Sequence, residues 1–144
     1  MPTTLHEAQT DAEIEACYPV LSQLRPHVPP EGFAALVRRL MEGGYKMAYA
    51  LDEGTVRAVA GYRYLDQLVR GRVLYVDDLV TEEGMRSRGY GEALLTWLYD
   101  LARTSQCTAL ELDSGVHRAE AHRFYFRQRM TISAFHFVRP ISPA

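Results

Sequence analysis

The chain has 144 residues and a mass of 16.4 kDa, a size typical of one domain. Apolar residues make up 47% of it and charged residues 24%, which argues against a disordered, collagen-like or coiled-coil protein. The net charge is −2 and no basic run stands out, so nucleic-acid binding has little electrostatic support.

The two cysteines, Cys17 and Cys107, lie far apart at a spacing that no metal site uses. We interpret them as small buried hydrophobic residues in a reducing compartment. No secretory-signal pattern is visible, and no run of about 18 apolar residues would span a membrane. We therefore expect a cytoplasmic protein with no metal site and no membrane or nucleic-acid partner.

The first third of the chain predicts one strand and two helices. A short strand at Thr3–Leu5 precedes a helix over Asp11–Leu24, in which apolar residues recur at helical spacing and Asp11 is the expected N-cap. A Pro-rich break over residues 25–30 separates it from a second helix at Glu31–Glu42, which ends at a Gly pair.

The sequence pattern then changes to that of strands. Strands are predicted at Tyr45–Leu51, Thr55–Tyr64 and Arg72–Val80, and a hairpin turn joins the first two. A charged loop at Thr81–Arg88 leads into an amphipathic helix over Gly89–Thr104.

The last predicted elements are a buried strand at Ala109–Asp113, a helix at His117–Gln128 and a strand of alternating pattern at Ile132–Val138. The element order β-α-α-β-β-β-α-β-α-β predicts an α/β (or α+β) fold. We expect a single domain over residues 1–144, in which helices cover a mixed central sheet.

The loop before the Gly89–Thr104 helix carries the pattern R-x-x-G-x-G, at Arg86, Gly89 and Gly91. The start of a helix leaves backbone N–H groups unpaired, and with the helix dipole they attract an anion. Glycines allow close approach of a phosphate, and Arg86 and Arg88 add charge-assisted hydrogen bonds. The loop therefore suits a pyrophosphate, although a Gly-containing loop that only permits a tight turn has the same pattern.

This loop and its flanking elements, followed by a strand and a helix with Ala121, Phe124 and Tyr125, resemble the GNAT superfamily of N-acetyltransferases. The resemblance implies acetyl-CoA as co-substrate and two parallel central strands that splay apart around its thioester. It also implies that backbone groups of Leu79 and Val80 contact the pantetheine arm. The pyrophosphate cradle implied by the resemblance comprises Arg86, Ser87, Arg88, Gly89, Tyr90, Gly91 and Glu92.

The sequence departs from the family pattern at the start of the last helix. Arg118 stands where many members have an Asn; we expect either that Arg118 reaches a phosphate in its place or that backbone groups near Ser114 and Gly115 supply the contact. Arg129 and Met130 replace a common Gly-Phe pair that forms a turn.

Acetyl transfer to an amine needs a proton acceptor, because a primary amine with a pKa near ~10.4 is almost wholly protonated at neutral pH. We rank Asp78 first as this base, then Asp113 and Asp77, with pairing to an Arg as the alternative for the adjacent aspartates. Strand alternation predicts that only one of Asp77 and Asp78 faces a given cleft. Asp113 shares a face with Glu111.

Two further groups complete the expected chemistry. The N–H of Leu79 is the expected donor to the oxyanion that develops during attack. By resemblance, Tyr125 is the general acid for the leaving thiolate, and simple packing on an apolar helix face is the alternative.

We therefore expect an acetyl-CoA-dependent N-acetyltransferase that modifies a primary amine of a small molecule by direct attack in a ternary complex. Carboxylates near the expected cleft favour a cationic amine. The alternatives are a peptide or protein N-acetyltransferase and a non-catalytic CoA-binding module. Many family members pair their last strands into dimers, and the apolar segment 132–138 makes a homodimer possible here.

Overall fold

The computed structural model describes residues 3–142, and the chain divides into two compact units, Met1–Leu112 and Asp113–Ala144. The second unit contains one helix, α4 (Ala119–Arg127), within its described residues. The elements of the first unit are β1 (Thr4–Glu7), α1 (Asp11–Leu24), α2 (Phe33–Glu42), β2 (Lys46–Asp52), β3 (Thr55–Gln67), β4 (Gly71–Thr81), α3 (Tyr90–Thr104) and β5 (Ala109–Leu112).

The first unit is built on a five-stranded sheet in the order β1-β2-β3-β4-β5. The first four strands are antiparallel to their neighbours, whereas β5 runs parallel to β4. The parallel pair is possible because α3 connects these two strands and returns the chain to the same end of the sheet. The predicted mixed sheet is confirmed.

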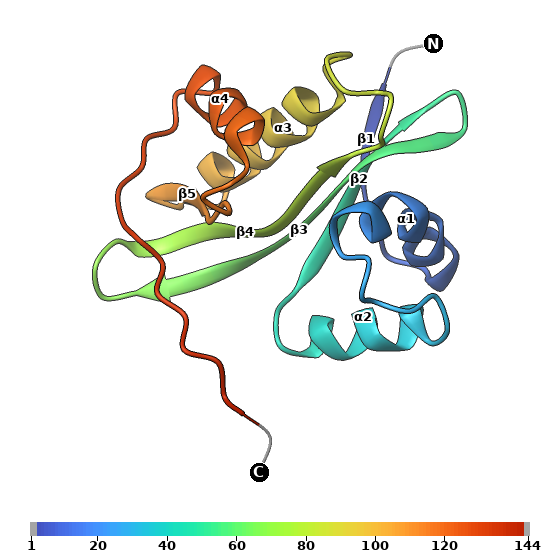
Figure 1. The fold of residues 1–144 in the computed structure, drawn as a ribbon, viewed down its shortest axis with the longest axis horizontal. Helices are drawn as coiled ribbons and strands as arrows, with labels where there is room; N and C mark the ends of the chain where they lie inside the picture. Colours follow the sequence, from blue (N-terminus) through green and yellow to red (C-terminus); the bar gives the residue numbers. More distant parts are fainter. Residues whose placement is uncertain (1–2, 143–144) are drawn as a thin grey trace. The chain divides into compact units, whose positions relative to one another are not determined.

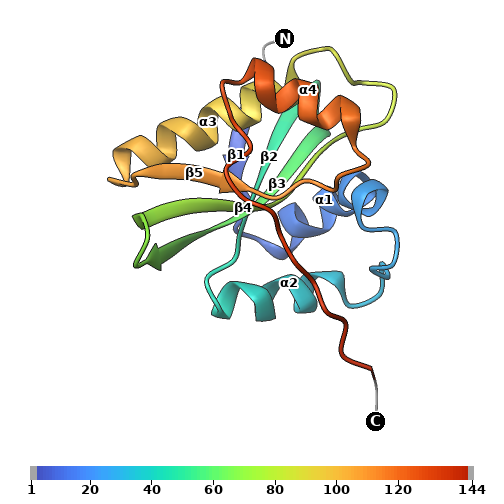
Figure 2. The same cartoon turned by 60° about the vertical axis from the view of Figure 1, so that its left-hand side comes forward.

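Helices cover both faces of this sheet, as expected (Figure 1). Strand alternation separates two cores, since Met47 lies in the core beneath α1 and α2 while Ala48 lies in the core beneath α3. The α3 core is lined by small residues of β2 and β3, such as Ala58 and Ala60, so that Leu94 and Leu98 of α3 pack closely on the strands. Figure 2 shows α3 on one side of the strands and α2 on the other.

Strand β4 has an irregular register against β3. Asp78 lies opposite Gly61, but Val76 lies opposite Tyr62, so Asp77 is an extra residue in a β-bulge. On its other side, β4 pairs with β5 only over Val73–Val76. Within the described part of the first unit, the stretch from Asp77 to Thr81 therefore has β3 along one edge and no strand along the other.

One sequence expectation about the start of α1 is wrong. The N-cap of α1 is Thr10 rather than Asp11: the hydroxyl of Thr10 accepts from the N–H of Glu13, and the carboxylate of Glu13 accepts from the N–H of Thr10. This reciprocal capping box satisfies two donors, and Asp11 instead pairs with Arg38.

The expected last strand at Ile132–Val138 is also wrong, since residues 130–142 contain no helix or strand. The segment is extended in Figures 1 and 2. Alternating apolar residues favour an extended chain, but a strand also requires a neighbour for its N–H and C=O groups. No such neighbour pairs with this segment among residues 3–142.

Candidate functional site

The loop between β4 and α3 turns sharply at three positions. Gly84, Ser87 and Gly89 have φ angles of +83°, +70° and +86°. Gly89 is the N-cap of α3 and offers no side chain to its first turn. Glycine takes this left-handed conformation without steric cost, which explains why the sequence has Gly at two of the three positions.

The backbone amides of this loop point away from internal partners. Within residues 3–142, the N–H groups from Arg86 to Glu92 donate to no other group of the protein. The side chains of Arg86, Ser87 and Arg88 are exposed. The side chain of Tyr90 is buried and its hydroxyl donates to Asp52 at 2.6 Å, so Tyr90 has only its amide to offer. This arrangement of donors and cations fits a pyrophosphate.

The predicted pantetheine contacts lie beside the bulge. Leu79 pairs with Ala60 of β3 and Val80 with Val59, and their side chains pack on opposite faces of the sheet. Because β5 ends at Leu112, the edge of β4 that faces away from β3 is open here in the described part of the first unit. Main-chain groups of this stretch therefore have no strand partner on that edge within the described part of the first unit.

Asp77 and Asp78 belong to a polar cluster of five residues, which we call the β4 cluster. Arg25 donates from Nε to Asp78 at 2.8 Å and from Nη2 to the carbonyl oxygen of Asp77 at 3.1 Å. The hydroxyl of Tyr45 donates to the other carboxylate oxygen of Asp78 at 2.8 Å. Arg63 donates to the carboxylate of Asp77 at 2.8 Å and lies over the ring of Tyr45.

The bulge puts both aspartates on the α1 face of the sheet, since their partners Arg63 and Tyr45 are themselves in contact. The expectation that only one of them faces that side is wrong, because it assumed regular alternation. Each carboxylate is paired with an Arg, the alternative stated above. The pairing also weakens the charge argument for a cationic acceptor, because the two carboxylates are neutralised.

Burial raises the pKa of two members of this cluster, Asp77 and Tyr45. Desolvation raises the pKa of Asp77, and the guanidinium of Arg63 opposes the rise. Desolvation and the neighbouring Asp78 carboxylate raise the pKa of Tyr45 well above its usual value, so the phenol keeps its proton. Arg25, Tyr45 and Arg63 were not predicted from the sequence as partners of these aspartates. Two carboxylates in an apolar strand signalled that partners were required, but not which residues supply them.

The remaining predicted residues are divided between the two units. On β5, Glu111 is paired with Arg70 at 2.8 Å. In the second unit, a carboxylate oxygen of Asp113 lies 3.6 Å from Nδ1 of His136. Arg118 is the N-cap residue of α4. Burial raises the pKa of Tyr125, while the positive charge of Arg118 and then its hydrogen bond oppose the rise. The phenol therefore stays protonated at neutral pH.

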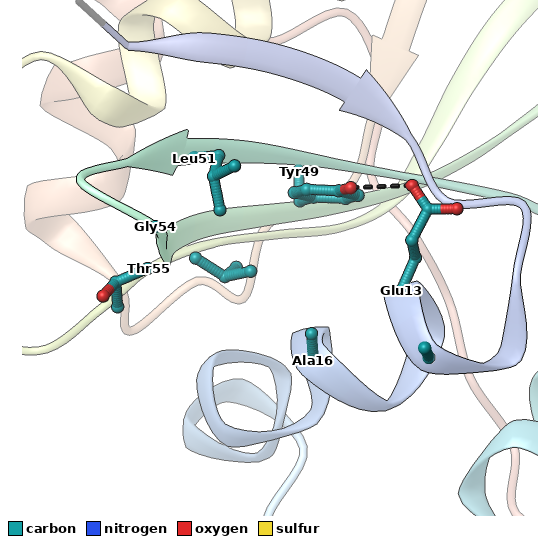
Figure 3. Close-up of a pocket in the computed structure, with 8 residues that line it drawn as sticks. Glu13, Ala16, Tyr49, Leu51, Gly54 and Thr55 are labelled. Carbon is teal, nitrogen blue, oxygen red and sulfur yellow. Dashed lines mark hydrogen bonds between the residues drawn. The ribbon is translucent and has the colours of Figure 1, made fainter. Parts of the chain in front are cut away.

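A separate hollow of about 410 Å³ lies between α1 and the β2–β3 hairpin (Figure 3). None of its lining residues belongs to the loop or to the β4 cluster. Glu13 and Tyr49 face each other across it, with the phenol donating to the carboxylate at 2.8 Å. The lining residues are Ala12, Glu13, Ala16, Tyr49, Leu51, Gly54, Thr55 and Val56.

Residues 3–142 contain neither a set of side chains arranged for a metal ion nor a helix suited to cross a membrane. No group of three or more His, Cys, Asp or Glu side chains is placed to hold a metal ion. No helix in that range combines the length and apolar character needed to cross a membrane.

The chain is similar to known acetyltransferases in sequence and fold. The model of the acetyltransferase (GNAT) family matches residues 9–130. The uncharacterized N-acetyltransferase YhdJ of Bacillus subtilis is 34% identical over 126 residues, which cover 86% of this chain and 89% of the relative. Aminoalkylphosphonate N-acetyltransferase of Salmonella typhimurium is 33% identical over 112 residues, covering 77% and 71%.

The fold is also found among solved structures. The crystal structure of ribosomal-protein-alanine N-acetyltransferase from Brucella melitensis matches with a TM-score of 0.84 at 17% identity, and the match covers 98% of this chain and 100% of that one. At this identity the likeness concerns the fold alone.

Proposed function

Because the chain belongs to the acetyltransferase (GNAT) family and is an acyltransferase, we propose that it transfers an acetyl group from acetyl-CoA to a primary amine of a small molecule. The observation that carries this proposal is the row of amides from Arg86 to Glu92, which have no partner within residues 3–142. In the proposal these amides, with Arg86 and Arg88, bind the pyrophosphate, and the main chain at Leu79 and Val80 binds the pantetheine arm. Arg118 is a further candidate for a phosphate contact.

The proposed reaction is a direct attack in a ternary complex. Asp78 accepts a proton from the bound ammonium, directly or through water, and Asp113 and Asp77 are the other candidates for this base. The neutral amine forms a C–N bond with the acetyl carbonyl carbon as the C–S bond breaks. The N–H of Leu79 stabilises the oxyanion, and Tyr125 gives its proton to the leaving thiolate. Tyr125 regains a proton through solvent as the amide nitrogen loses its second one.

One of the two relatives supports a small acceptor. The Salmonella relative is named for aminoalkylphosphonates, which carry an amine and an anionic group on one short chain. We therefore propose small amines as acceptors, and peptide or protein amines are the alternative.

Three further expectations are part of this proposal. We propose that residues 1–144 act as one domain, that the chain forms a homodimer through its apolar C-terminal segment, and that it works in the cytoplasm. The free thiols of Cys17 and Cys107 support a reducing compartment.

Thermal unfolding with CoA and with acetyl-CoA tests the phosphate loop. At ligand about 100-fold above its dissociation constant, we expect stabilisation of about 2.7 kcal/mol. The double variant Arg86→Ala, Arg88→Ala should lose most of this shift. Arg39→Ala, Arg103→Ala is the matched control, since it removes two exposed arginines from α2 and α3. No shift with wild type at millimolar ligand would refute the proposal.

Release of free CoA thiol tests the transfer and the acceptor. The panel includes aminoalkylphosphonates, amino sugars, simple diamines and peptides with a free N-terminus. Faster release with small amines supports the proposal, and release with peptides alone supports the alternative. Binding without release for any amine would indicate a CoA-binding module.

A further inference from the structure

The guanidinium of Arg25 connects the end of α1 to the open edge of β4. Arg25 is the C-cap residue of α1, and its N–H bonds back to the carbonyl of Leu21. Its side chain donates to two successive residues more than fifty positions later in the sequence. The acceptors are the carboxylate of Asp78 and the main-chain carbonyl of Asp77.

The second of these bonds meets a requirement of the bulge. Asp77 is the extra residue of β4, with no counterpart in the register of β3. An extra residue leaves main-chain groups without their usual partners in the ladder. Arg25 supplies a donor for the Asp77 carbonyl, so the same side chain fixes the peptide that leads into Asp78 and Leu79.

The first bond leaves Asp78 with little freedom. The Asp78 side chain is 14% exposed, and its two oxygens are held by Arg25 and Tyr45. Tyr45 is anchored in the core, whereas the Arg25 side chain is 42% exposed. Because only the Arg25 end of this ion pair is exposed, its loss lowers stability by leaving an oxygen of a largely buried carboxylate unpaired. The loss also changes geometry, because it frees one carboxylate oxygen and one bulge carbonyl together.

We propose that Arg25 is a positioning residue for acetyl transfer, which orients the Asp78 carboxylate and the main chain entering Leu79. This inference rests on the proposed function. A displacement of about 1 Å at reacting groups can lower a rate about 100-fold. Loss of Arg25 should therefore lower kcat about 10- to 100-fold and change the KM for acetyl-CoA less, because the proposed pyrophosphate contacts of the loop before α3 remain and only the pantetheine contact at Leu79 is disturbed.

The test compares steady-state kinetics and melting temperature of wild type, Arg25→Ala, Arg25→Lys and a control. Arg38→Ala is the matched control, because Arg38 also binds a carboxylate and a main-chain carbonyl, those of Asp11 and Gln9, but far from β4. We expect an intermediate kcat for Arg25→Lys, whose ammonium cannot reproduce the forked contact. Millimolar guanidinium should restore part of the kcat of Arg25→Ala and none of that of Asp78→Asn.

The outcomes decide the inference in each case. If Arg25→Ala keeps the kcat of Arg38→Ala, or if its kcat and melting temperature fall together without guanidinium rescue, the positioning role is refuted. If Arg25→Ala does not fold, Arg25→Lys is compared with wild type instead. An unchanged kcat for Arg25→Lys then refutes the positioning role. If wild type transfers no acetyl group to any amine, the proposed function fails and this inference fails with it.

Discussion

At the residue scale, the β4 cluster depends on the absence of a side chain at Gly61. A Cβ at this position would lie 1.8 Å from the Tyr45 hydroxyl oxygen and 2.6 Å from a carboxylate oxygen of Asp78. Both atoms would have to move, and they hold each other by a hydrogen bond. Gly61 therefore serves close packing, since its φ is not in the left-handed region.

Gly61→Ala should destabilise the protein by about 1–3 kcal/mol, as expected for overpacking in a core. Urea unfolding measures this difference. Gly43→Ala is the control, because its Cβ would meet only the carbonyl oxygen of Leu40 at 3.4 Å. Equal free energies of unfolding for the two variants would mean that Tyr45 moves aside without cost.

The hydroxyl of Tyr125 is the proposed proton donor to the leaving thiolate, so its removal tests one atom. Tyr125→Phe should lower kcat by about 100-fold or more if the hydroxyl protonates the leaving thiolate. Tyr99→Phe, which alters an exposed tyrosine of α3, is the control and should keep the wild-type rate. A wild-type turnover number for Tyr125→Phe would leave Tyr125 as a packing residue only.

At the element scale, local patterns predicted most of the fold. The bounds of α1 agree with the prediction at both ends, because its apolar spacing and the following Pro-rich break are local signals. The bulge at Asp77 was not predictable in this way. It is a property of the register between β3 and β4, and register depends on a partner strand that periodicity within one segment does not identify. The Arg25 and Tyr45 contacts were missed for the same reason.

The capping box of α1 makes a prediction about acid stability. Hydrogen bonds from Thr10, Tyr49 and Gln9 lower the pKa of Glu13 from its ordinary value of 4.5 to about 2. The folded state therefore favours the ionised carboxylate. This contribution is present above the unfolded pKa of 4.5 and is lost as pH falls toward 2.

The free energy of unfolding of wild type should therefore exceed that of Glu13→Gln near neutral pH, and the difference should shrink through this acid range. Urea unfolding at several pH values measures it. Glu42→Gln, at an exposed residue at the end of α2, should show no such pH-dependent difference. If the difference in free energy of unfolding between wild type and Glu13→Gln stays constant with pH, the pKa of Glu13 is not lowered in the folded state.

At the scale of the whole molecule, the C-terminal segment raises the question of a partner. It exposes large apolar side chains at Ile132, Phe135, Phe137, Val138 and Ile141, and it forms no strand. The sheet of the first unit ends at β5, whose outer edge pairs with no strand among residues 3–142. The apolar segment of one chain could pair with the free sheet edge of a second copy, because each supplies what the other lacks.

If that second copy provides the partner, wild type should have about twice the 16.4 kDa mass of one chain in multi-angle light scattering. Phe135→Ser with Phe137→Ser should shift the mass to one chain, because each buried Phe removes about 150–250 Å² of surface from water. Phe126→Ser, at an exposed phenylalanine on α4, is the control and should leave the dimer intact. A monomeric wild type at every concentration tested would rule out this assembly, and the segment would then require a different partner.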